Sequence, residues 1–159
     1  MKRLLISFTA ILLLLSACEK SCLEKRPKNV KPIDWENYND VYTVYWNYRT
    51  LCSEIKTEDL GREIMLTGWV RLPLHNGEDY FSLVSDVAEA GEYPGPVPTP
   101  NISIAMYSDS IRYYLASCDL TKKCFIKGRL DISCHDLSGI CESKAYPHLL
   151  NVGNIYFEE

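Results

Sequence analysis

Two segments of this chain, residues 62–72 and 124–132, alternate apolar and other side chains with a period of two, and each has a glycine near its centre. Because successive side chains of a strand point to opposite faces of a sheet, the alternation predicts two half-buried strands. A glycine inside a strand permits sharp bending and close approach by another segment. The chain is therefore restricted to a mainly β structure with strongly curved strands. The residues expected to face inward are Ile64, Leu66, Gly68, Val70 and Leu72 in the first segment and Cys124, Ile126, Gly128, Leu130 and Ile132 in the second.

Three further strands are expected from similar signals. An Asn76-Gly77 turn precedes the first of them, and a loop rich in glycine and proline over residues 90–100 follows it. A short helix with Ser108 or Asp109 as its N-cap comes before the second alternating segment, with its apolar stripe on Ile111, Tyr114, Leu115 and Cys118. The three expected strands are Tyr80–Ser85 with Phe81 and Leu83 inward, Asn101–Tyr107 with Ile102, Ile104 and Met106 inward, and Leu149–Phe157.

A helix is also expected ahead of the first alternating segment, within residues 34–60. Its apolar residues recur at intervals of three and four, Asp34 or Asn39 can cap its start, and Gly61 can end it. Its many aromatic side chains also permit a strand, so the sequence leaves both structures open here. The residues of the apolar stripe are Val41, Val44, Tyr48, Leu51 and Ile55.

The first eighteen residues have the features of an export signal. Lys2 and Arg3 precede an apolar run, Leu4 to Leu15, that is too short to span a bilayer comfortably. Small residues then precede Cys18, and this pattern resembles the lipobox of bacterial lipoproteins. The resemblance implies removal of residues 1–17, a diacylglycerol on the Cys18 thiol and an acyl chain such as palmitate on its amine, which together anchor the protein stably. An ordinary cleaved signal, with Cys18 present by chance, is the alternative.

Charge is distributed unevenly along the exported part of the chain. Removing Lys2 and Arg3 from the 17 basic residues leaves 15 against 21 acidic residues, a net charge of −6. Residues 19–33 carry a net charge of +3, whereas residues 34–159 carry 10 basic and 19 acidic residues, a net charge of −9. The basic part, broken by prolines, is expected to be a flexible tether, either drawn to anionic headgroups or simply solvated. The acidic body is expected to repel nucleic acid.

Six cysteines remain when Cys18 carries the lipid, and an even number in an exported domain favours disulfides over free buried thiols. Proximity along the chain favours three pairs, each expected to stabilise the fold by roughly 2–4 kcal/mol. The three pairs are Cys134 with Cys141, Cys118 with Cys124, and Cys22 with Cys52.

The expected element order is strand, strand, strand, helix, strand, strand, which is the order of the OB-fold, a five-stranded Greek-key barrel. Residues 61–86 resemble the start of an anticodon-binding OB domain, on Gly68-Trp69-Val70 followed by Phe81-x-Leu83-x-x-Asp86. The resemblance implies an OB-like barrel over residues 61–159, with one helix between its third and fourth strands. Anticodon binders have basic residues in the turn where this chain has Leu72 to Asp79, so the fold is carried over without the ligand. The expected division is signal 1–17, lipidated tether 18–33, helical segment 34–60 and barrel 61–159.

The ligand surface of OB barrels is the face of the second and third strands. Aromatic rings beside hydrogen-bonding groups on this face could stack on a sugar, a base or a peptide. The alternative is that Trp69 and the tyrosines pack under the amino-terminal helix. The loop Tyr93–Pro98 is expected to be a further contact for a protein partner. The candidate ligand-binding residues are Trp69, Arg71, Tyr80, Ser82, Ser103 and Tyr107.

The sequence offers no motif for catalysis or for a metal or cofactor. It has no Gly-x-Ser-x-Gly elbow, and its three histidines, His75, His135 and His148, lack the spacing of metal ligands. The favoured function is therefore a non-catalytic, membrane-anchored lipoprotein of the bacterial envelope that binds a protein partner or an envelope glycan. Glu19 follows Cys18, in place of the aspartate that retains lipoproteins at the inner membrane, so the resemblance favours the outer membrane. An oligonucleotide or tRNA binder and a small envelope enzyme are the alternatives.

Overall fold

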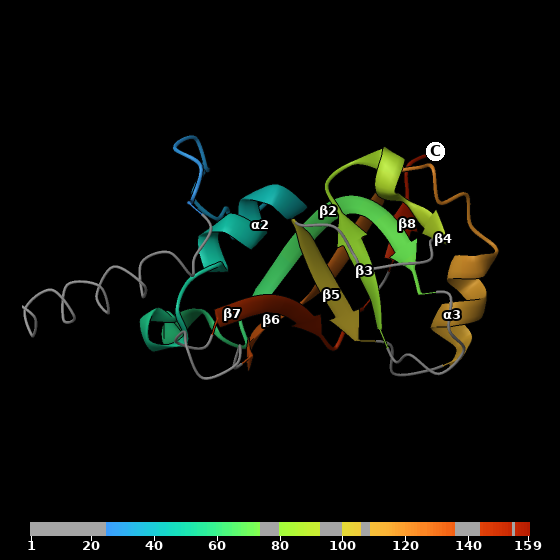
Figure 1. Ribbon diagram of the computed structural model, residues 1–159. Helices are drawn as coiled ribbons and strands as arrows, with labels where there is room; N and C mark the ends of the chain where they lie inside the picture. Colours follow the sequence, from blue (N-terminus) through green and yellow to red (C-terminus); the bar gives the residue numbers. More distant parts are fainter. Residues whose placement is uncertain (1–24, 74–79, 93–99, 106–108, 136–143, 154) are drawn as a thin grey trace, which may run out of the picture.

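The computed structural model describes residues 25–73, 80–92, 100–105, 109–135, 144–153 and 155–159. Five strands form a closed barrel, in which neighbours follow the order β2-β3-β5-β7-β6 and β6 pairs again with β2 (Figure 1). β5 and β7 run parallel, and the other pairs of the barrel are antiparallel. The expected mainly β architecture, with a closed five-stranded barrel and two helices, is thereby confirmed. The barrel strands are β2 (Glu63–Leu72), β3 (Tyr80–Val84), β5 (Asn101–Ala105), β6 (Cys124–His135) and β7 (Lys144–Leu150).

Three short strands extend the barrel at its edges. β1 (Tyr38–Asp40) and β4 (Gly91–Glu92) pair in parallel with opposite ends of β2, and β8 (Ile155–Phe157) pairs antiparallel with the start of β6. The sequence did not predict β1 or β4. Each forms by pairing with β2, and neither has an alternating apolar pattern that would reveal it.

Helix α2 (Val41–Tyr48) is shorter than the apolar stripe predicted. Asp40 is its N-cap, where Oδ1 accepts a hydrogen bond from the amide of Thr43 at 2.6 Å, so the expected caps Asp34 and Asn39 were wrong. The helix starts late because the residues before it pair with β2 as β1. It ends at Arg49, after which Leu51 makes an isolated bridge to Lys144 and Cys52–Glu54 form a 3-10 turn.

The second helix, α3 (Asp109–Ala116), lies between β5 and β6 in the chain and toward the opposite end of the molecule from α2 (Figure 1). Leu115 of α3 is completely buried in the same core as four residues of α2 and the inner side chains of all five barrel strands. The period-two prediction of the inner face is confirmed for every described residue except Ile132, which is only partly buried. Two more 3-10 turns are Thr57–Asp59, which precedes β2, and Val87–Glu89, which lies between β3 and β4.

Gly68 is the point where α2 rests on β2. A Cβ atom at this position would lie 2.7 Å from Cγ2 of Val41 and 2.8 Å from the carbonyl oxygen of Val84. No side chain fits there, so the close approach expected of this glycine is confirmed and it fixes how near the helix lies to the barrel wall.

The last two strands differ from the single strand Leu149–Phe157 that the sequence predicted. β7 begins at Lys144 and ends at Leu150, and Asn151 then turns the chain with a φ of 49° before β8. Pro147, inside β7, lacks an amide hydrogen and obscures the strand pattern in the sequence. The predicted Asn76-Gly77 turn and the residues Met106 and Tyr107 lie outside the described residues.

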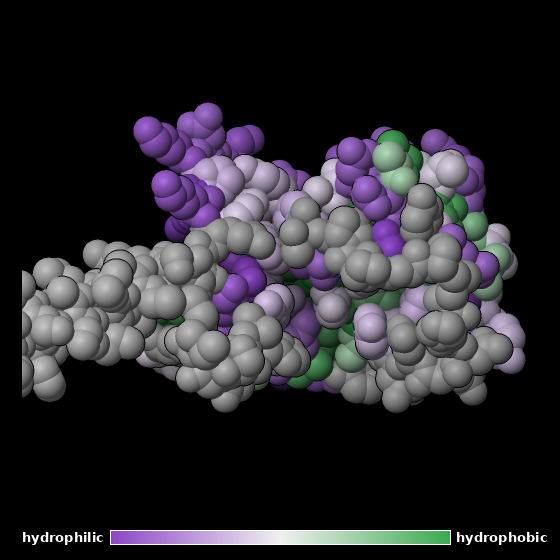
Figure 2. All heavy atoms as spheres, viewed as in Figure 1, coloured by the Kyte–Doolittle hydropathy of each residue, from purple (hydrophilic) through white to green (hydrophobic). Residues whose placement is uncertain are grey.

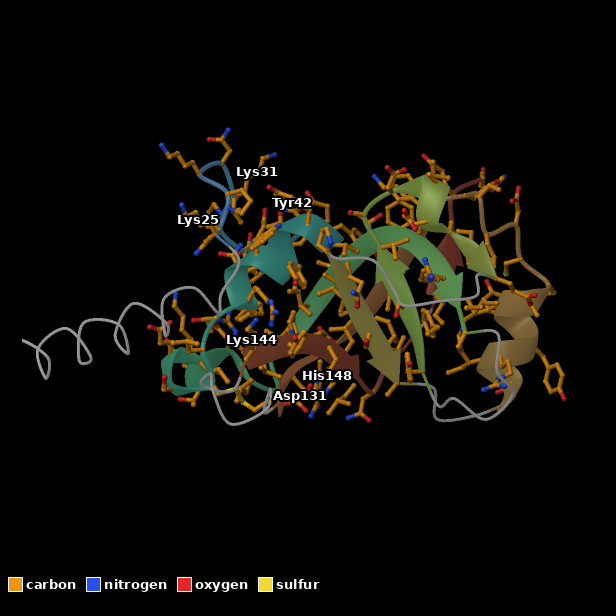
Figure 3. The ribbon with its side chains drawn as sticks, viewed as in Figure 1. Lys25, Lys31, Tyr42, Asp131, Lys144 and His148 are labelled. Carbon is orange, nitrogen blue, oxygen red and sulfur yellow. A yellow bond between two sulfur atoms is a disulfide. The ribbon has the colours of Figure 1, made fainter. Side chains whose placement is uncertain are left out.

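The basic segment before the barrel packs against α2 from Arg26 onward, instead of forming a flexible tether through residue 33. The Arg26 guanidinium donates to Oδ1 of Asn47 at 2.9 Å, and Nδ2 of Asn47 donates to the carbonyl of Lys31 at 2.7 Å. Hydrophilic residues gather over this segment (Figure 2), and Lys25 and Lys31 project from it (Figure 3). The signal residues and Cys18 lie outside the described part of the chain, within which no helix is long and apolar enough to span a membrane.

One disulfide joins Cys52 to Cys134, with a Cα–Cα distance of 6.0 Å. The expected pairs Cys134–Cys141 and Cys22–Cys52 were therefore wrong, and Cys118 and Cys124 are free thiols. Strand pairing brings Cys52 and Cys134 together. Cys134 on β6 is the Cα partner of Ala145 on β7, and the Ala145 amide donates to the carbonyl of Thr50, two residues before Cys52, at 3.0 Å. Cys124 is fully buried, and burial raises the pKa of its thiol to about 12. Cys22 and Cys141 lie outside the described residues.

Candidate functional site

A row of polar side chains crosses four neighbouring strand pairs on the outer face of the barrel. The Cα partners run from Arg71 on β2 to Ser82 on β3, Ser103 on β5, His148 on β7 and Asp131 on β6. Residues that are directly opposite in a sheet share a face. We call these five residues the polar row. It places hydrogen-bonding groups from five separate segments along one line.

A groove of about 400 Å³ lies over the part of this row on β5 and β7. We call it the tyrosine groove, because Tyr80 of β3 and Tyr146 of β7 both line it. Its volume falls within the range of about 300–1,000 Å³ typical of small-ligand sites. Tyr80 is 40% exposed, so part of its ring is available for contact. The residues that line the groove are Tyr80, Ser103, Ala105, Ser133, Tyr146, Pro147 and His148.

Arg49, the residue at the C-terminal end of α2, holds the ring of Tyr146 in place. Its Nη2 donates to the Tyr146 hydroxyl at 3.2 Å, and its Cζ lies 4.2 Å from the centroid of the same ring. Nη1 of Arg49 also donates to the carbonyl of Ala145 at 3.2 Å. The guanidinium thereby fixes both the backbone and the side chain of this part of β7, which preorganises one wall of the groove.

His148 and Asp131 lie side by side where β7 pairs with β6 (Figure 3). Nε2 of His148 is 3.2 Å from Oδ2 of Asp131, and Nδ1 is 3.5 Å from the carbonyl oxygen of Tyr146. These two contacts restrict the orientation of the imidazole. Ser103 is the register partner of His148 on the neighbouring strand, and both imidazole nitrogens of His148 face other groups, the Asp131 carboxylate and the Tyr146 carbonyl.

The polar row is covered at its β2 end. Arg71 is only 4% exposed and pairs with Glu89 at 3.3 Å, and Ser82 is 1% exposed. Glu89 belongs to the 3-10 turn Val87–Glu89, and Gly91 of β4 lies beside Arg71 in the sheet as its Cα partner. Arg71 and Ser82 were expected among the outward ligand-binding residues, but both are buried and neither lines the groove.

Trp69 lies apart from the groove on β2, where Nζ of Lys123 is 5.2 Å from the centroid of its ring. Of the sequence-predicted ligand residues, Tyr80 and Ser103 are brought together in the groove, and Tyr107 and the loop Tyr93–Pro98 are outside the described residues. The expected packing of tyrosines under the amino-terminal helix does not describe Tyr80, which lies on the outer face.

Several residues of the site were not predicted, and those with polar side chains on β6 and β7 are Asp131, Ser133, Tyr146 and His148. The signal that could have found the last two is the alternation of Lys144–Leu150, in which Tyr146 and His148 are partly exposed while Ala145 and Leu149 are buried. Within the described residues, no group of three histidine, cysteine or acidic side chains is arranged to hold a metal ion.

Comparison with known proteins does not assign this chain to a family. The sequence matches no family model and no curated protein. Among solved structures, it is similar to a chain of the structure described as "OBody AM3L09 bound to hen egg-white lysozyme". The sequence identity is 14%, the match covers 69% of this chain and 93% of that chain, and the TM-score is 0.39.

Proposed function

We propose that this protein is a non-catalytic binding module that holds a glycan in the tyrosine groove. The observation that carries the proposal is the meeting of two tyrosine rings with Ser103, Ser133 and His148 in one groove of about 400 Å³. A sugar ring presents C–H faces that pack against aromatic rings, and hydroxyls that need hydrogen-bond partners. The groove supplies both kinds of group on rigid strands.

We infer further that the barrel is a Greek-key barrel of the OB type. The strand order β2-β3-β5-β7-β6, the parallel pair β5–β7 and the position of α3 between β5 and β6 support this inference. The ligand face of such barrels lies on the second and third strands. The tyrosine groove begins on the corresponding strands, β3 and β5, and continues onto β7.

The proposed location is the bacterial envelope, with a lipid on Cys18 as the anchor. The lipobox-like sequence before Cys18 supports this location. The basic residues that project from the segment packed on α2 support contact with anionic headgroups. By the same resemblance, Glu19 supports the outer membrane.

Binding of chitotriose, a neutral trisaccharide of N-acetylglucosamine, tests the proposal directly. We expect saturable binding to the full-length protein in detergent micelles, measured by saturation-transfer NMR titration. Tyr80→Ala and Tyr146→Ala should each weaken it by roughly fivefold, the effect of one lost ring contact of about 1 kcal/mol. Tyr113→Ala is the matched control, because Tyr113 is 74% exposed on α3.

Unchanged affinity in both groove variants, or no saturable binding, would overturn the glycan proposal. A protein partner is the second candidate, favoured by the open, preorganised wall at Tyr146. Crosslinking in the native envelope followed by mass spectrometry tests it, since a protein partner should be lost in the Tyr80→Ala, Tyr146→Ala double variant. An oligonucleotide would instead have to overcome the net charge of −9 over residues 34–159.

A further inference from the structure

A second hollow lies on the outer face of the barrel, away from the tyrosine groove. It has a volume of about 580 Å³ and lies where the start of β2, the middle of β6 and the turn before β8 meet. We call it the arginine hollow. Tyr38 and Tyr156 line it, with exposed fractions of 44% and 55%. The charged residues that line it are Glu63, Lys127 and Arg129.

The charges in the arginine hollow leave one cation available. Nζ of Lys127 is 2.7 Å from Oε1 of Glu63, so these two charges neutralise each other. Arg129 is exposed and, within the described part of the chain, makes no ion pair or hydrogen bond through its side chain. An arginine fork binds a carboxylate through two parallel hydrogen bonds. The hollow therefore offers one site for an anionic group between two tyrosines.

The two hollows follow one another along the outer face of β6. Its outward residues are Lys127 and Arg129 in the arginine hollow, then Asp131, which contacts His148, and Ser133 in the tyrosine groove. At about 3.3 Å per residue, the distance from Lys127 to Ser133 is roughly 20 Å. A linear ligand bound in the tyrosine groove can thus continue along the same strand to Arg129.

The net charge of the body limits the kind of ligand. Residues 25–159, which include the basic segment packed on α2, carry 14 basic and 19 acidic residues, a net charge of −5 that repels a polymer with a negative charge on every unit. A single free guanidinium in the arginine hollow suits a single carboxylate. The combination favours a chain that is mainly neutral and carries acidic groups at intervals.

We propose that the arginine hollow is a second subsite that accepts an acidic sugar, so that the bound glycan is a linear chain of alternating neutral and acidic units. This inference rests on the proposed function of the tyrosine groove. Tyr38 and Tyr156 pack against the sugar ring, and Arg129 binds its carboxylate.

Two matched hexasaccharides test this second subsite on the full-length protein. A hyaluronan hexasaccharide alternates N-acetylglucosamine with glucuronate, whereas chitohexaose is neutral throughout. We expect the hyaluronan hexasaccharide to bind roughly fivefold more tightly, the effect of about one well-placed ion pair. Arg129→Gln should abolish this difference and leave the affinity for chitotriose unchanged. Lys122→Gln, which removes one exposed positive charge elsewhere, should preserve the difference.

The outcomes separate this inference from the proposed function. Binding of chitotriose with equal affinity for both hexasaccharides would overturn the acidic subsite and leave the tyrosine groove in place. An equal loss of preference in Lys122→Gln would also overturn it, because the effect would then come from overall charge. Absence of binding by all three oligosaccharides would overturn both proposals.

Discussion

Gly68 is the residue at which the contact between α2 and the barrel is most sensitive to change. Gly68→Ala places a Cβ 2.8 Å from the carbonyl oxygen of Val84, which is backbone and cannot move aside cheaply. We expect the free energy of unfolding to fall by about 1–3 kcal/mol, measured by urea denaturation. Gly153→Ala is the control, because its Cβ would meet only the Lys127 carbonyl oxygen, at 3.9 Å. Equal effects of the two substitutions would contradict the close packing of Val41 and Val84 around Gly68.

Tyr48 gives a prediction about pH. Its hydroxyl donates to Oδ2 of Asp59 at 3.0 Å, and burial, followed by the charge of Asp59, raises the pKa of Tyr48 above its ordinary value of 10.0. Above pH 10 the unfolded chain ionises this tyrosine while the folded protein retains the proton, so stability falls as the pH rises. Tyr48→Phe should cost about 1 kcal/mol at neutral pH through the lost hydrogen bond and should flatten the decline above pH 10.

Denaturation of both proteins at neutral pH and at about pH 10.5 checks this prediction. Tyr113→Phe, at a position that is 74% exposed, should keep the wild-type profile. Parallel pH profiles for the wild type and Tyr48→Phe would show that Tyr48 does not set the alkaline limit.

At the scale of elements, Asp40 determines where α2 begins. Its carboxylate accepts from the Thr43 amide at 2.6 Å, so Asp40→Ala should cost about 1 kcal/mol of stability. Asp40→Asn should be nearly neutral, since asparagine caps helices about as well as aspartate. A melting curve for each variant distinguishes the two cases, and equal destabilisation by alanine and asparagine would argue against the capping role.

The strands that the sequence predicts best are those with an uninterrupted apolar period. β2 and β6 follow from alternation alone, and Phe81 and Leu83 mark the inner face of β3. β7 was missed because Pro147 interrupts its pattern, and α2 was predicted too long because Leu51 continues the helical spacing although it bridges Lys144. Local patterns cannot report such pairings, since the partner lies far away in the chain.

At the scale of the whole molecule, the candidate site depended on contacts between distant segments. The face carrying Tyr80 and Ser103 follows from alternation and register, and both residues line the groove. Arg71 is buried, pairs with β4 in the sheet and contacts Glu89 of the turn Val87–Glu89, and neither of these segments has an apolar period that reveals it in the sequence. His148 and Asp131 become neighbours only through the pairing of β6 with β7, so neither residue attracts notice in the sequence alone.

The Cys52–Cys134 disulfide also acts on the whole molecule, because it closes a loop with a sequence separation of 82. Replacing both cysteines by serine should lower the free energy of unfolding by roughly 2–4 kcal/mol, measured by chemical denaturation without reductant. Reductant should destabilise the wild type more than it destabilises the double variant. Cys118→Ser should retain the response to reductant, because Cys118 is a free thiol. A wild type insensitive to reductant would contradict the role of this bridge.

Closure of the barrel has a consequence for the order of folding. β6 pairs with β2 from Glu63–Arg129 to Gly68–Cys124, so the two strands that close the barrel are separated by β3, β5 and α3. Contacts between residues so far apart carry a large loop-closure entropy and slow the folding of β-rich domains. Until β6 and β7 arrive, the edges of β2 and β5 are exposed and can pair with another chain. The nascent protein is therefore most prone to aggregation just before its last strands are in place.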